Sequence, residues 1–469
     1  MAHTDLRGNF HSRTEQLINE TMGNQEVEDS FKQKAWRNFR VAVRISSQAA
    51  NTYAGQLMLL STVNLVGRYC DNLYLPESLH GVDCIVPFYI GRNLDLLERC
   101  VQVFESINPL ANAEAGNAGP EKAVSIGISS DAEIVIGSDN WISYISSDAR
   151  DAPLIDNRNP FGPIFASCLG SAETFRRLLQ AIGATGVSMR NRTQAVSFSV
   201  LEGHSVTLHN QNPEFPRGVS TGKILLAGCG AVGNGIVSAL ALMGDLHGSV
   251  TLLDDEALEE SNVSRYAATT LSDIGNSKVC ILGDALRRDT ISITPLVASV
   301  ESLTDSTVMS YDTIVSALDN RSNHQSRIFL QNLLPKRIIH AATQGLAAAV
   351  ANIDFIHGAC LGCLFYPRKE HLTLVQDPDC GGVVVKTKEG NKHAAAVSFV
   401  SAASGILAAA EVIKLSIPEL RPFSLNNYLN MSLMSPELAD VRFLEKDPHC
   451  VCLCSQPFKQ RAYARRYNA

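Results

Sequence analysis

Three glycines in the stretch 224-ILLAGCGAVGNGIVSALALMG-244 are spaced so that they could hold a phosphate group. Gly228, Gly230 and Gly233 follow an apolar run and precede a helical pattern of small residues. In a strand–turn–helix unit, the first glycine allows the tight turn, the second lets a phosphate approach the backbone, and the third lets the helix pack on the sheet. The N–H groups and the positive dipole end of the helix then attract the phosphate. The turn therefore predicts a nucleotide site.

The run GSVTLLD after this turn is expected to be a strand that ends in Asp254, which lies 21 residues after Gly233. An acid at this point can accept hydrogen bonds from both ribose hydroxyls of a nucleotide. The glycines and this acid fit an NAD site and an ATP site equally well. The residues that follow must distinguish the two.

Two cations and an amide follow in EESNVSRY and DIGNSKV, namely Asn262, Arg265 and Lys278. Positive charge beside a phosphate site suits a triphosphate, because cleavage of its bonds gathers negative charge. A nicotinamide enzyme has no use for these cations there. The alternative interpretation is a solvated charged loop.

A further apolar strand is expected in TIVSALDN, and it ends in Asp319. A carboxylate at the carboxyl end of a strand, beside the phosphate loop, is well placed to bind Mg²⁺. The alternative role of Asp319 is to cap the start of a helix, and the two roles are compatible.

Five cysteines of the last third form close groups, Cys360 with Cys363 in CLGC, and Cys450, Cys452 and Cys454 in DPHCVCLC. In a cytosolic chain of this size, such groups indicate a metal more than disulfides. Four thiolates in tetrahedral geometry suit a structural zinc ion. The spacing leaves open which two members of the second group are ligands, and five reduced thiols without a metal are the alternative.

Cys380 stands apart from these groups, in VQDPDCGGVVV. The Asp, Pro and Gly residues around it predict a loop, and a small-residue helix, FVSAASGILAAAEVIKL, follows. A thiolate attacks an activated carboxyl group and later leaves readily, so a loop cysteine suits a nucleophile. The alternative is a loop cysteine without a role.

The elements that must position these residues alternate between strand and helix. Strands and helices alternate from Phe39 to Ile182 and again from the glycine turn onward, which predicts parallel sheets of the α/β class. A hairpin and a Pro/Gly-rich linker are expected over 187–220, so we expect domains at 1–200 and 201–469. Residues 10–35 are expected to form polar, surface-exposed helices.

The two halves of the sequence are similar to each other. PIFASCLGSAETFRRLL and FVSAASGILAAAEVIKL are both small-residue helical patterns with an Ala-Glu pair near one end. This similarity indicates an ancient duplication, although small-residue helices often look alike. The corresponding turn of the first copy, VRISSQAANTYAG, holds no G-x-G-x-x-G pattern, so the first copy is expected to be degenerate.

The overall composition excludes several classes of protein. The net formal charge of −7 argues against a nucleic-acid binder, which usually carries a basic surplus. The N-terminus has no apolar core like that of a secretory signal, and no run of 18 or more apolar residues predicts a membrane span. A cytoplasmic location is expected.

The motifs GCGAVG, LLDDEALEESNVSRY, DIGNSKV, SALDN and HAATQG, in this order, resemble the E1-like adenylating family, which includes the ThiF and MoeB proteins and the ubiquitin-type E1 enzymes. The resemblance covers about residues 205–455 and implies a Rossmann-like fold with a mixed, mostly parallel sheet. It implies that Asp254 holds the ribose of ATP, and that Asp319 binds Mg²⁺. Asn262, Arg265 and Lys278 would bind the phosphates. The chain departs from the family at Glu256, where Asp is usual, and at Tyr266, where Gln is common.

The resemblance also implies an activity. In the family, the C-terminal carboxylate of a small ubiquitin-like protein attacks the α-phosphate of ATP and forms an acyl-adenylate. Similar proteins carry a zinc site in two cysteine pairs, and Cys450 best matches the family position. Cys380 would form a thioester, or a persulfide in sulfur-carrier systems. Arg13, in HSRTEQLINETMG, resembles the arginine that reaches from a partner or an inactive half to the ATP.

We therefore expect an E1-like enzyme that passes a ubiquitin-like protein from Cys380 to an E2-type carrier. Its compactness is similar to that of E1 proteins of bacterial ubiquitin-like conjugation operons, including antiphage operons. Family domains work in pairs, so either a homodimer or a pseudo-dimer within the chain is expected. The alternatives are a sulfur-carrier or peptide adenylyltransferase without an E2, and a non-catalytic scaffold that binds ubiquitin-like proteins. An NAD oxidoreductase fits least.

Overall fold

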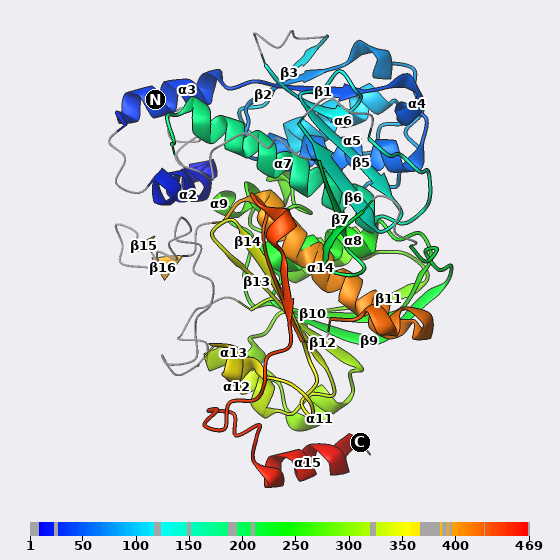
Figure 1. Ribbon diagram of the computed structural model, residues 1–469, viewed down its shortest axis with the longest axis vertical. Coiled ribbons are helices and arrows are strands. Elements are labelled where there is room, and N and C mark those ends of the chain that lie inside the picture. Colours follow the sequence, from blue (N-terminus) through cyan, green and yellow to red (C-terminus); the bar gives the residue numbers. More distant parts are fainter. Residues whose placement is uncertain are drawn as a thin grey trace.

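The computed structural model of the chain contains two eight-stranded mixed sheets. Each half of the sequence forms one of them (Figure 1). The structure describes residues 9–22, 27–116, 123–147, 152–185, 195–207, 212–318, 325–365, 385–386, 392–393, 396–425 and 427–467. The expected α/β class is confirmed.

The first sheet has the strand order β3-β2-β1-β4-β5-β6-β7-β8. Its strands are β1 (Val41–Ile45), β2 (Asn72–Leu75), β3 (Asn112–Ala115), β4 (Val124–Ile128), β5 (Ile134–Asp139), β6 (Ile142–Ser146), β7 (Val196–Ser199) and β8 (His204–Val206). The helices of this half are α2 (Ser12–Met22), α3 (Asp29–Asn38), α4 (Ser47–Ala50), α5 (Tyr53–Gly67), η1 (Glu77–Leu79), α6 (Leu96–Ile107) and α7 (Phe161–Ala181).

The second sheet has the order β11-β10-β9-β12-β13-β14-β17-β18. Its strands are β9 (Val219–Ala227), β10 (Leu246–Leu253), β11 (Ile291–Leu296), β12 (Thr313–Ser316), β13 (Ile338–Gln344), β14 (Ala347–Ile353), β17 (Tyr428–Ser432) and β18 (Asp440–Arg442). The α-helices of this half are α8 (Ala231–Ala241), α9 (Glu260–Val263), α10 (Lys278–Leu286), α11 (Asp305–Met309), α12 (Gln325–Asn332), α13 (Leu361–Phe365), α14 (Ser398–Ser416) and α15 (Pro457–Tyr467). Short elements are η3 (Leu271–Asp273), η4 (Val300–Ser302), η6 (Pro418–Phe423), η7 (Pro436–Leu438) and the antiparallel pair β15 (Val385–Lys386) and β16 (Lys392–His393).

The two sheets have the same topology, strand for strand. In both, the first five strands in spatial order pair in parallel and the last three pairings are antiparallel. A helix follows the central strand in each half, α5 after β1 and α8 after β9, and a long helix, α7 or α14, precedes the seventh strand in chain order. This correspondence confirms a degenerate N-terminal copy of the second half's fold. The first sheet ends at Val206, after the expected hairpin, and the second begins at Val219.

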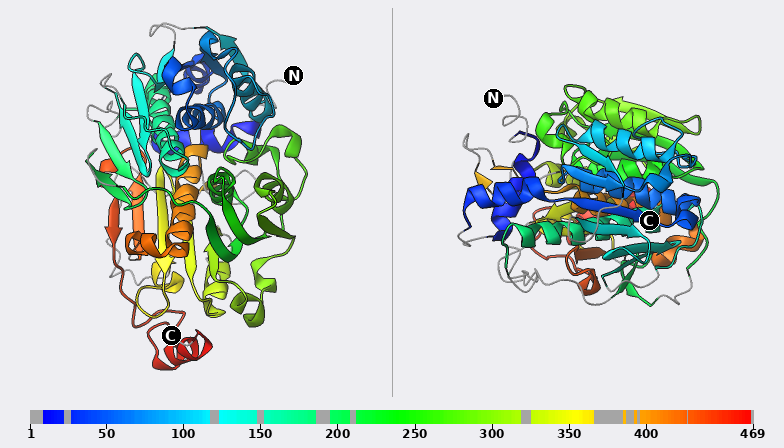
Figure 2. Two further views of the ribbon diagram at one scale, coloured as in Figure 1. Left: turned by 90° about the vertical axis from the view of Figure 1, so that its right-hand side faces the viewer. Right: turned by 90° about the horizontal axis from the view of Figure 1, so that it is seen from above.

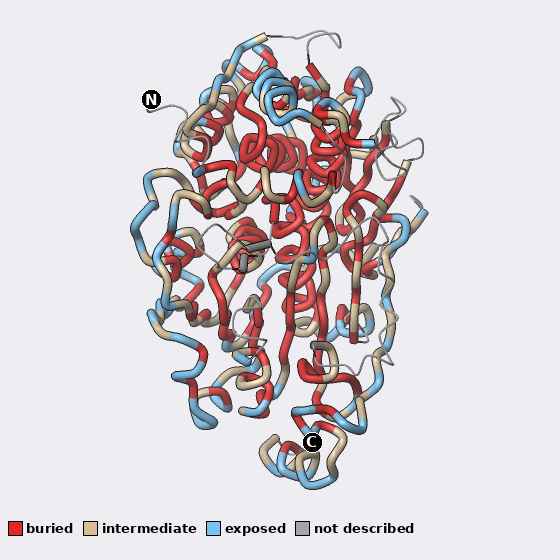
Figure 3. The backbone as a smooth tube through the Cα atoms, turned by 90° about the vertical axis from the view of Figure 1, so that its left-hand side faces the viewer, coloured by how far each residue is buried: buried red, intermediate tan, exposed pale blue. Residues whose placement is uncertain are grey.

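The long helices α7 and α14 pack against each other between the two halves (Figures 1 and 2). Buried residues follow this central region, whereas exposed residues lie mainly at the periphery (Figure 3). By length and composition alone, α14 could span a membrane. However, 94% of the apolar stretch that meets this criterion is buried inside the protein. Its close contact with α8 requires glycine, since a Cβ at Gly405 would lie 2.5 Å from the backbone of Gly235.

The expectation of surface-exposed helices over 10–35 is wrong for one helix face. Phe10 and His11 are buried, and α2 buries Leu17, Ile18 and Met22 against the core. These apolar residues recur at helical spacing among polar ones, which is the pattern of a half-buried helix.

Candidate active site

The glycine turn between β9 and α8 is closed so tightly that side chains do not fit at two of its positions. Gly228 has a φ of +95°, and a Cβ there would lie 2.7 Å from the carbonyl oxygen of Ala317. A Cβ at Gly233 would lie 2.3 Å from the carbonyl oxygen of Gly228. Gly230 caps the start of α8, and a Cβ on it would stand 3.5 Å from the hydroxyl of Tyr266. The turn therefore has the geometry expected from its sequence.

The N-terminus of α8 is open, whereas its counterpart in the first half is closed by side chains. Among the described residues, no side chain caps α8. In the first half, the Asp156 carboxylate accepts a hydrogen bond of 3.1 Å from Ala54 N, and the Thr52 hydroxyl accepts one of 3.0 Å from Gly55 N. A carboxylate thus already occupies the helix end that would otherwise attract a phosphate in the first half.

Asp254 lies directly after β10, beside the glycine turn. Its Oδ2 accepts a hydrogen bond of 2.8 Å from Cys229 N, within the turn, and its Oδ1 accepts one of 2.9 Å from Glu256 N. These bonds fix the carboxylate next to the place where the chain turns from strand to helix. The acid is therefore where the sequence places it.

The ring of Tyr266 brings the two expected cations together. The guanidinium carbon of Arg265 lies 5.3 Å from the ring centre, and Lys278 Nζ lies 5.6 Å from it. Such contacts attract a cation through the quadrupole of the ring. Tyr266 itself is buried, and its hydroxyl is near Gly230, so both cations belong to the surroundings of the glycine turn.

The two cations differ in what they contact. The buried Lys278 ammonium forms an ion pair with the Glu256 carboxylate, which is about one third exposed. Arg265 Nε is buried and has no hydrogen-bond partner in the described part of the chain. Glu256, where the chain departs from the family pattern, is thus the ion-pair partner of Lys278. Arg265 Nε can still donate a hydrogen bond.

Asn262 is buried and shapes the start of α9. Its side-chain oxygen accepts a hydrogen bond of 3.2 Å from Glu259 N, and the Glu259 side chain accepts one from Asn262 N, which together form a capping box. Its amino group has no recorded partner among the described residues. Asn262 therefore keeps a donor for a further contact.

The N-terminal segment before α2 packs on the candidate site of the same chain. Phe10 is fully buried in a cluster with Leu258, Val263, Tyr266 and Ile281. The preceding Asn9 donates to Glu260 at 3.4 Å.

His11 holds the same segment to the first half, since its Nε2 lies 2.9 Å from Asp71 Oδ1. The half-buried Arg13 follows Phe10 by about one helical turn. The element that carries Arg13 thus contacts the site of its own chain.

Two expected site residues, Asp319 and Cys380, lie outside the described residues. The chain just before Asp319 is fixed, because the Arg327 guanidinium of α12 donates to Leu318 O at 3.0 Å. β12 ends at Ser316, beside the last residue of β9. The approach to Asp319 therefore begins at the same sheet edge as the glycine turn.

Four of the five clustered cysteines, Cys360, Cys363, Cys450 and Cys454, come together with all their sulfur atoms within 4.8 Å of one another. Tetrahedral zinc with Zn–S bonds of about 2.3 Å requires sulfur atoms roughly 3.8 Å apart. The closest pairs here, Cys360–Cys450 and Cys363–Cys454, are 3.4 Å apart. These residues fit a structural zinc ion.

Cys452 lies beside the group of four without belonging to it. A Cβ on Gly362 would lie 2.6 Å from Cys452 Sγ and 2.9 Å from Cys450 Sγ, so CLGC needs its glycine. Of the three cysteines in the second group, Cys450 and Cys454 are the two that lie with Cys360 and Cys363.

Cys229, inside the glycine turn, is a buried thiol. Burial, together with the charge of Asp254, raises its pKa well above the usual range. It therefore lacks the thiolate character of a nucleophile.

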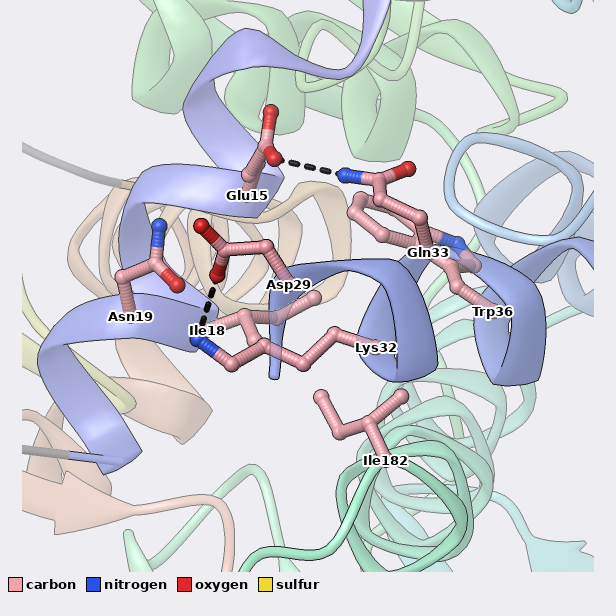
Figure 4. A pocket seen from close by; sticks show the side chains of 8 residues that line it. All are labelled: Glu15, Ile18, Asn19, Asp29, Lys32, Gln33, Trp36 and Ile182. Carbon is pink, nitrogen blue, oxygen red and sulfur yellow. Dashed lines mark hydrogen bonds and ion pairs between the residues drawn. The ribbon is translucent and has the colours of Figure 1, made fainter. Parts of the chain in front are cut away.

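A small hollow, partly open to solvent, lies between α2, α3 and the end of α7 (Figure 4). Four of its polar side chains pair with one another, because Lys32 lies 3.0 Å from Asp29 and Gln33 donates to Glu15 at 2.7 Å. It adds no chemistry to the candidate site.

Sequence reasoning missed two residues of the first half that contact this site. Asn64 and Arg68, near the end of α5, are buried and donate to backbone carbonyls of 263–269. An arginine directly after an apolar helical pattern is the only local signal, and it does not identify the partner.

The chain is similar to several known proteins. The family model described as "ThiF family" matches residues 206–452. The uncharacterized protein y4jF of Sinorhizobium fredii is 26% identical over 91% of this chain and 91% of its own length. Escherichia coli MccB with succinimide is 20% identical, with a TM-score of 0.38 over 50% of this chain and 66% of MccB, a little under two thirds of its length. MccB with ATP is 16% identical, with a TM-score of 0.36. Because the family model covers more than half of the chain, the protein belongs to the ThiF family of E1-like, ATP-dependent adenylating enzymes.

Proposed function

We propose that the second half uses MgATP to adenylate the C-terminal carboxylate of a ubiquitin-like protein. The observation that carries this proposal is the contrast between the halves at equivalent helix ends. In the described part of the chain, no side chain caps the N-terminus of α8, which lies near two cations, whereas Asp156 closes the N-terminus of α5. The first half is then the inactive partner of a pseudo-dimer within one chain.

In this proposal, each site residue has a defined role. The glycine turn binds the phosphates through backbone N–H groups, and Asp254 accepts the ribose hydroxyls. The phosphates are bound by Asn262, Arg265 and Lys278. When the nucleotide binds, Lys278 breaks its ion pair with Glu256 and contacts a phosphate instead. Asp319 holds Mg²⁺, which when bound reduces the repulsion between the triphosphate and the incoming carboxylate.

The first step is a displacement at the α-phosphorus. A carboxylate oxygen of the ubiquitin-like protein forms a bond to this phosphorus, and the bond to the oxygen that bridges to the β-phosphate breaks. Pyrophosphate leaves with the electron pair, and no proton is transferred. Arg265 and Lys278 stabilise the negative charge that gathers on the phosphate oxygens.

The second step assigned to this chain is transfer to Cys380. The thiolate attacks the carbonyl carbon of the acyl-adenylate, AMP leaves, and the thioester passes to the cysteine of an E2-type carrier. Five of the described cysteines do not suit this role, since Cys229 is a buried thiol and Cys360, Cys363, Cys450 and Cys454 surround the proposed zinc ion. That zinc ion would cross-link α13 to the segment before α15.

The test is ATP–pyrophosphate exchange in the presence of a ubiquitin-like protein. Asp319→Ala is expected to abolish exchange. Cys380→Ala is expected to retain exchange and to lose the covalent adduct that thiol releases, whereas Cys280→Ala, at an exposed cysteine, retains both. Absence of exchange in the unmodified chain would contradict the proposal and favour a binding scaffold.

The same assay separates the finer alternatives. Exchange without a thiol-sensitive adduct would favour a sulfur-carrier or peptide adenylyltransferase that meets no E2. The E2 partner, a role in antiphage defence and the cytoplasmic location belong to this proposal as well. A ubiquitin-like protein and an E2 encoded by neighbouring genes would support them.

A further inference from the structure

Arg68 crosses from the first half into the candidate site of the second. It follows the last residue of α5 and is 0% exposed. Its guanidinium donates to the carbonyl oxygens of Val263, Ala267 at 3.0 Å and Thr269 at 2.9 Å. A single side chain of one half therefore holds three backbone groups of the other half.

These three carbonyls flank the residues that carry the cationic part of the site. Val263 lies two residues before Arg265, and Ala267 lies two residues after it. The clamped segment also contains Tyr266, on whose ring Arg265 and Lys278 rest. Fixing the backbone on both sides limits where the Arg265 side chain can point.

Asn64, one turn earlier on α5, supports the same clamp. Its side-chain oxygen accepts hydrogen bonds of 3.1 and 2.8 Å from Arg68, and its amino group donates to Ala267 O at 2.9 Å. The first half thus orients the arginine as well as supplying it.

Asn234 of α8 connects the segment to the glycine turn. It accepts from Ala268 N at 3.2 Å and donates to Gly230 O at 3.0 Å. The clamp and the phosphate-binding turn are therefore parts of one hydrogen-bonded unit.

The geometry requires an arginine. A guanidinium offers five donors in a planar fork, whereas a lysine ammonium is a point charge on a flexible stem. Burial lowers the pKa of Arg68 to about 9, which keeps it charged at neutral pH. A charge at this depth is satisfied only by directed acceptors, and the carbonyls supply them.

We propose that Arg68 is a positioning residue for adenylation, through which the degenerate half holds Arg265 in its working position. This inference rests on the proposed function of the second half. It assigns the first half a direct part in the chemistry, since a displaced Arg265 no longer stabilises charge on the phosphates.

The test compares Arg68→Lys with Arg288→Lys in the full chain. Arg288 is the control because it also donates to backbone carbonyls, those of Leu240, Ala241 and Met243 at the other end of α8 and that of Leu286. Arg68→Lys is expected to lower kcat of ATP–pyrophosphate exchange at least tenfold with a smaller change in KM for ATP, and Arg288→Lys to leave both within twofold. In an Arg265→Ala chain, Arg68→Lys is expected to have no further effect, because the residue it positions is gone.

Equal effects of the two lysine variants, or an undiminished effect of Arg68→Lys in the Arg265→Ala chain, would overturn the inference. Hydrogen exchange of the amides of 263–269 in the nucleotide-free chain gives a readout that does not depend on catalysis. Arg68→Lys is expected to accelerate this hydrogen exchange at least tenfold, and an unchanged rate would also overturn the clamp.

If the unmodified chain lacks ATP–pyrophosphate exchange, the proposed function fails, while the hydrogen-exchange measurement still tests the clamp. If Arg68→Lys does not fold, Asn64→Ala replaces it, with the same expectations.

Discussion

Lys414 Nζ, on the long helix α14 of the second half, donates a hydrogen bond of 2.8 Å to the carbonyl oxygen of Leu201 in the first half. The relationship is reciprocal, because Arg176 of α7 donates to the carbonyl oxygen of Met434 in the second half. Leu201 follows β7, and Met434 follows β17, the corresponding strand. Each half thus holds the other through an equivalent buried cation.

Both cations are paired on their own helix with a buried glutamate three residues earlier. Arg176 lies 3.1 Å from Glu173, and Lys414 pairs with Glu411. Glu411 also accepts a hydrogen bond of 3.0 Å from Leu425 N. The Ala-Glu pairs noted in the two helical patterns therefore hold glutamates with the same role, since each glutamate pairs with a buried cation one turn later on its own helix.

Replacing Lys414 by methionine is expected to destabilise the chain by about 3–5 kcal/mol, because Glu411 would remain as an uncompensated buried charge. The double change Glu411→Gln with Lys414→Met removes that charge and is expected to recover part of the loss. Urea unfolding followed by circular dichroism measures both effects. A single variant as stable as the unmodified chain would show that this pair does not hold the halves together.

Replacing Glu256 by glutamine is expected to tighten ATP binding about fivefold, because it removes the group that competes for Lys278. This change corresponds to about 1 kcal/mol, the size expected for a partly exposed ion pair. Asp255→Asn makes the same change of charge at the neighbouring exposed residue and is expected to leave the Kd unchanged. Calorimetric titration with a non-hydrolysable ATP analogue measures the three values. Weaker binding by Glu256→Gln would mean that this carboxylate assists the nucleotide.

Local patterns in the sequence were sufficient to predict the elements around the glycine turn, namely β9, α8, β10 and β12. The glycine turn is recognisable because its φ angles and close contacts exclude other residues, and Asp254 follows from its place after a strand. The alternation of strands and helices expected from Phe39 to Ile182 is present in the first half, where α5, α6 and α7 lie between strands in the chain. These features depend on residues close together in the chain, where spacing carries the information.

The features that the sequence did not reveal depend on contacts between distant residues. Arg68 meets Val263 across 195 positions, and Phe10 enters a cluster with Tyr266 of the other half. Neither local spacing nor hydropathy indicates which carbonyls a buried arginine will find. The presence of Cys454 rather than Cys452 in the group of four likewise depends on how the final loop folds over Gly362.

Arg13 is expected to act on the site of its own chain, since Phe10 seats the same segment against Tyr266. Arg13→Ala is expected to slow ATP–pyrophosphate exchange at least tenfold, or about 1.4 kcal/mol in the barrier. Arg37→Ala, at an exposed arginine of α3, is the control and is expected to be silent.

Mixing Arg13→Ala chains with Lys278→Met chains then tests action within the chain. If Arg13 serves only its own chain, every molecule in the mixture lacks one required cation, and no activity returns. Activity recovered on mixing would mean that Arg13 reaches the site of a second copy instead.

The last prediction concerns the group of four cysteines, and Cys452 serves as its internal control. Cys454→Ser is expected to reduce bound zinc from about one ion per chain to a small fraction and to lower the Tm by several degrees, because a structural metal contributes to folding directly. Cys452→Ser changes the same atom two residues away and is expected to retain the zinc. Elemental analysis of purified chains together with thermal unfolding measures both effects. Loss of zinc by Cys452→Ser and its retention by Cys454→Ser would mean that the other member of the loop is the ligand.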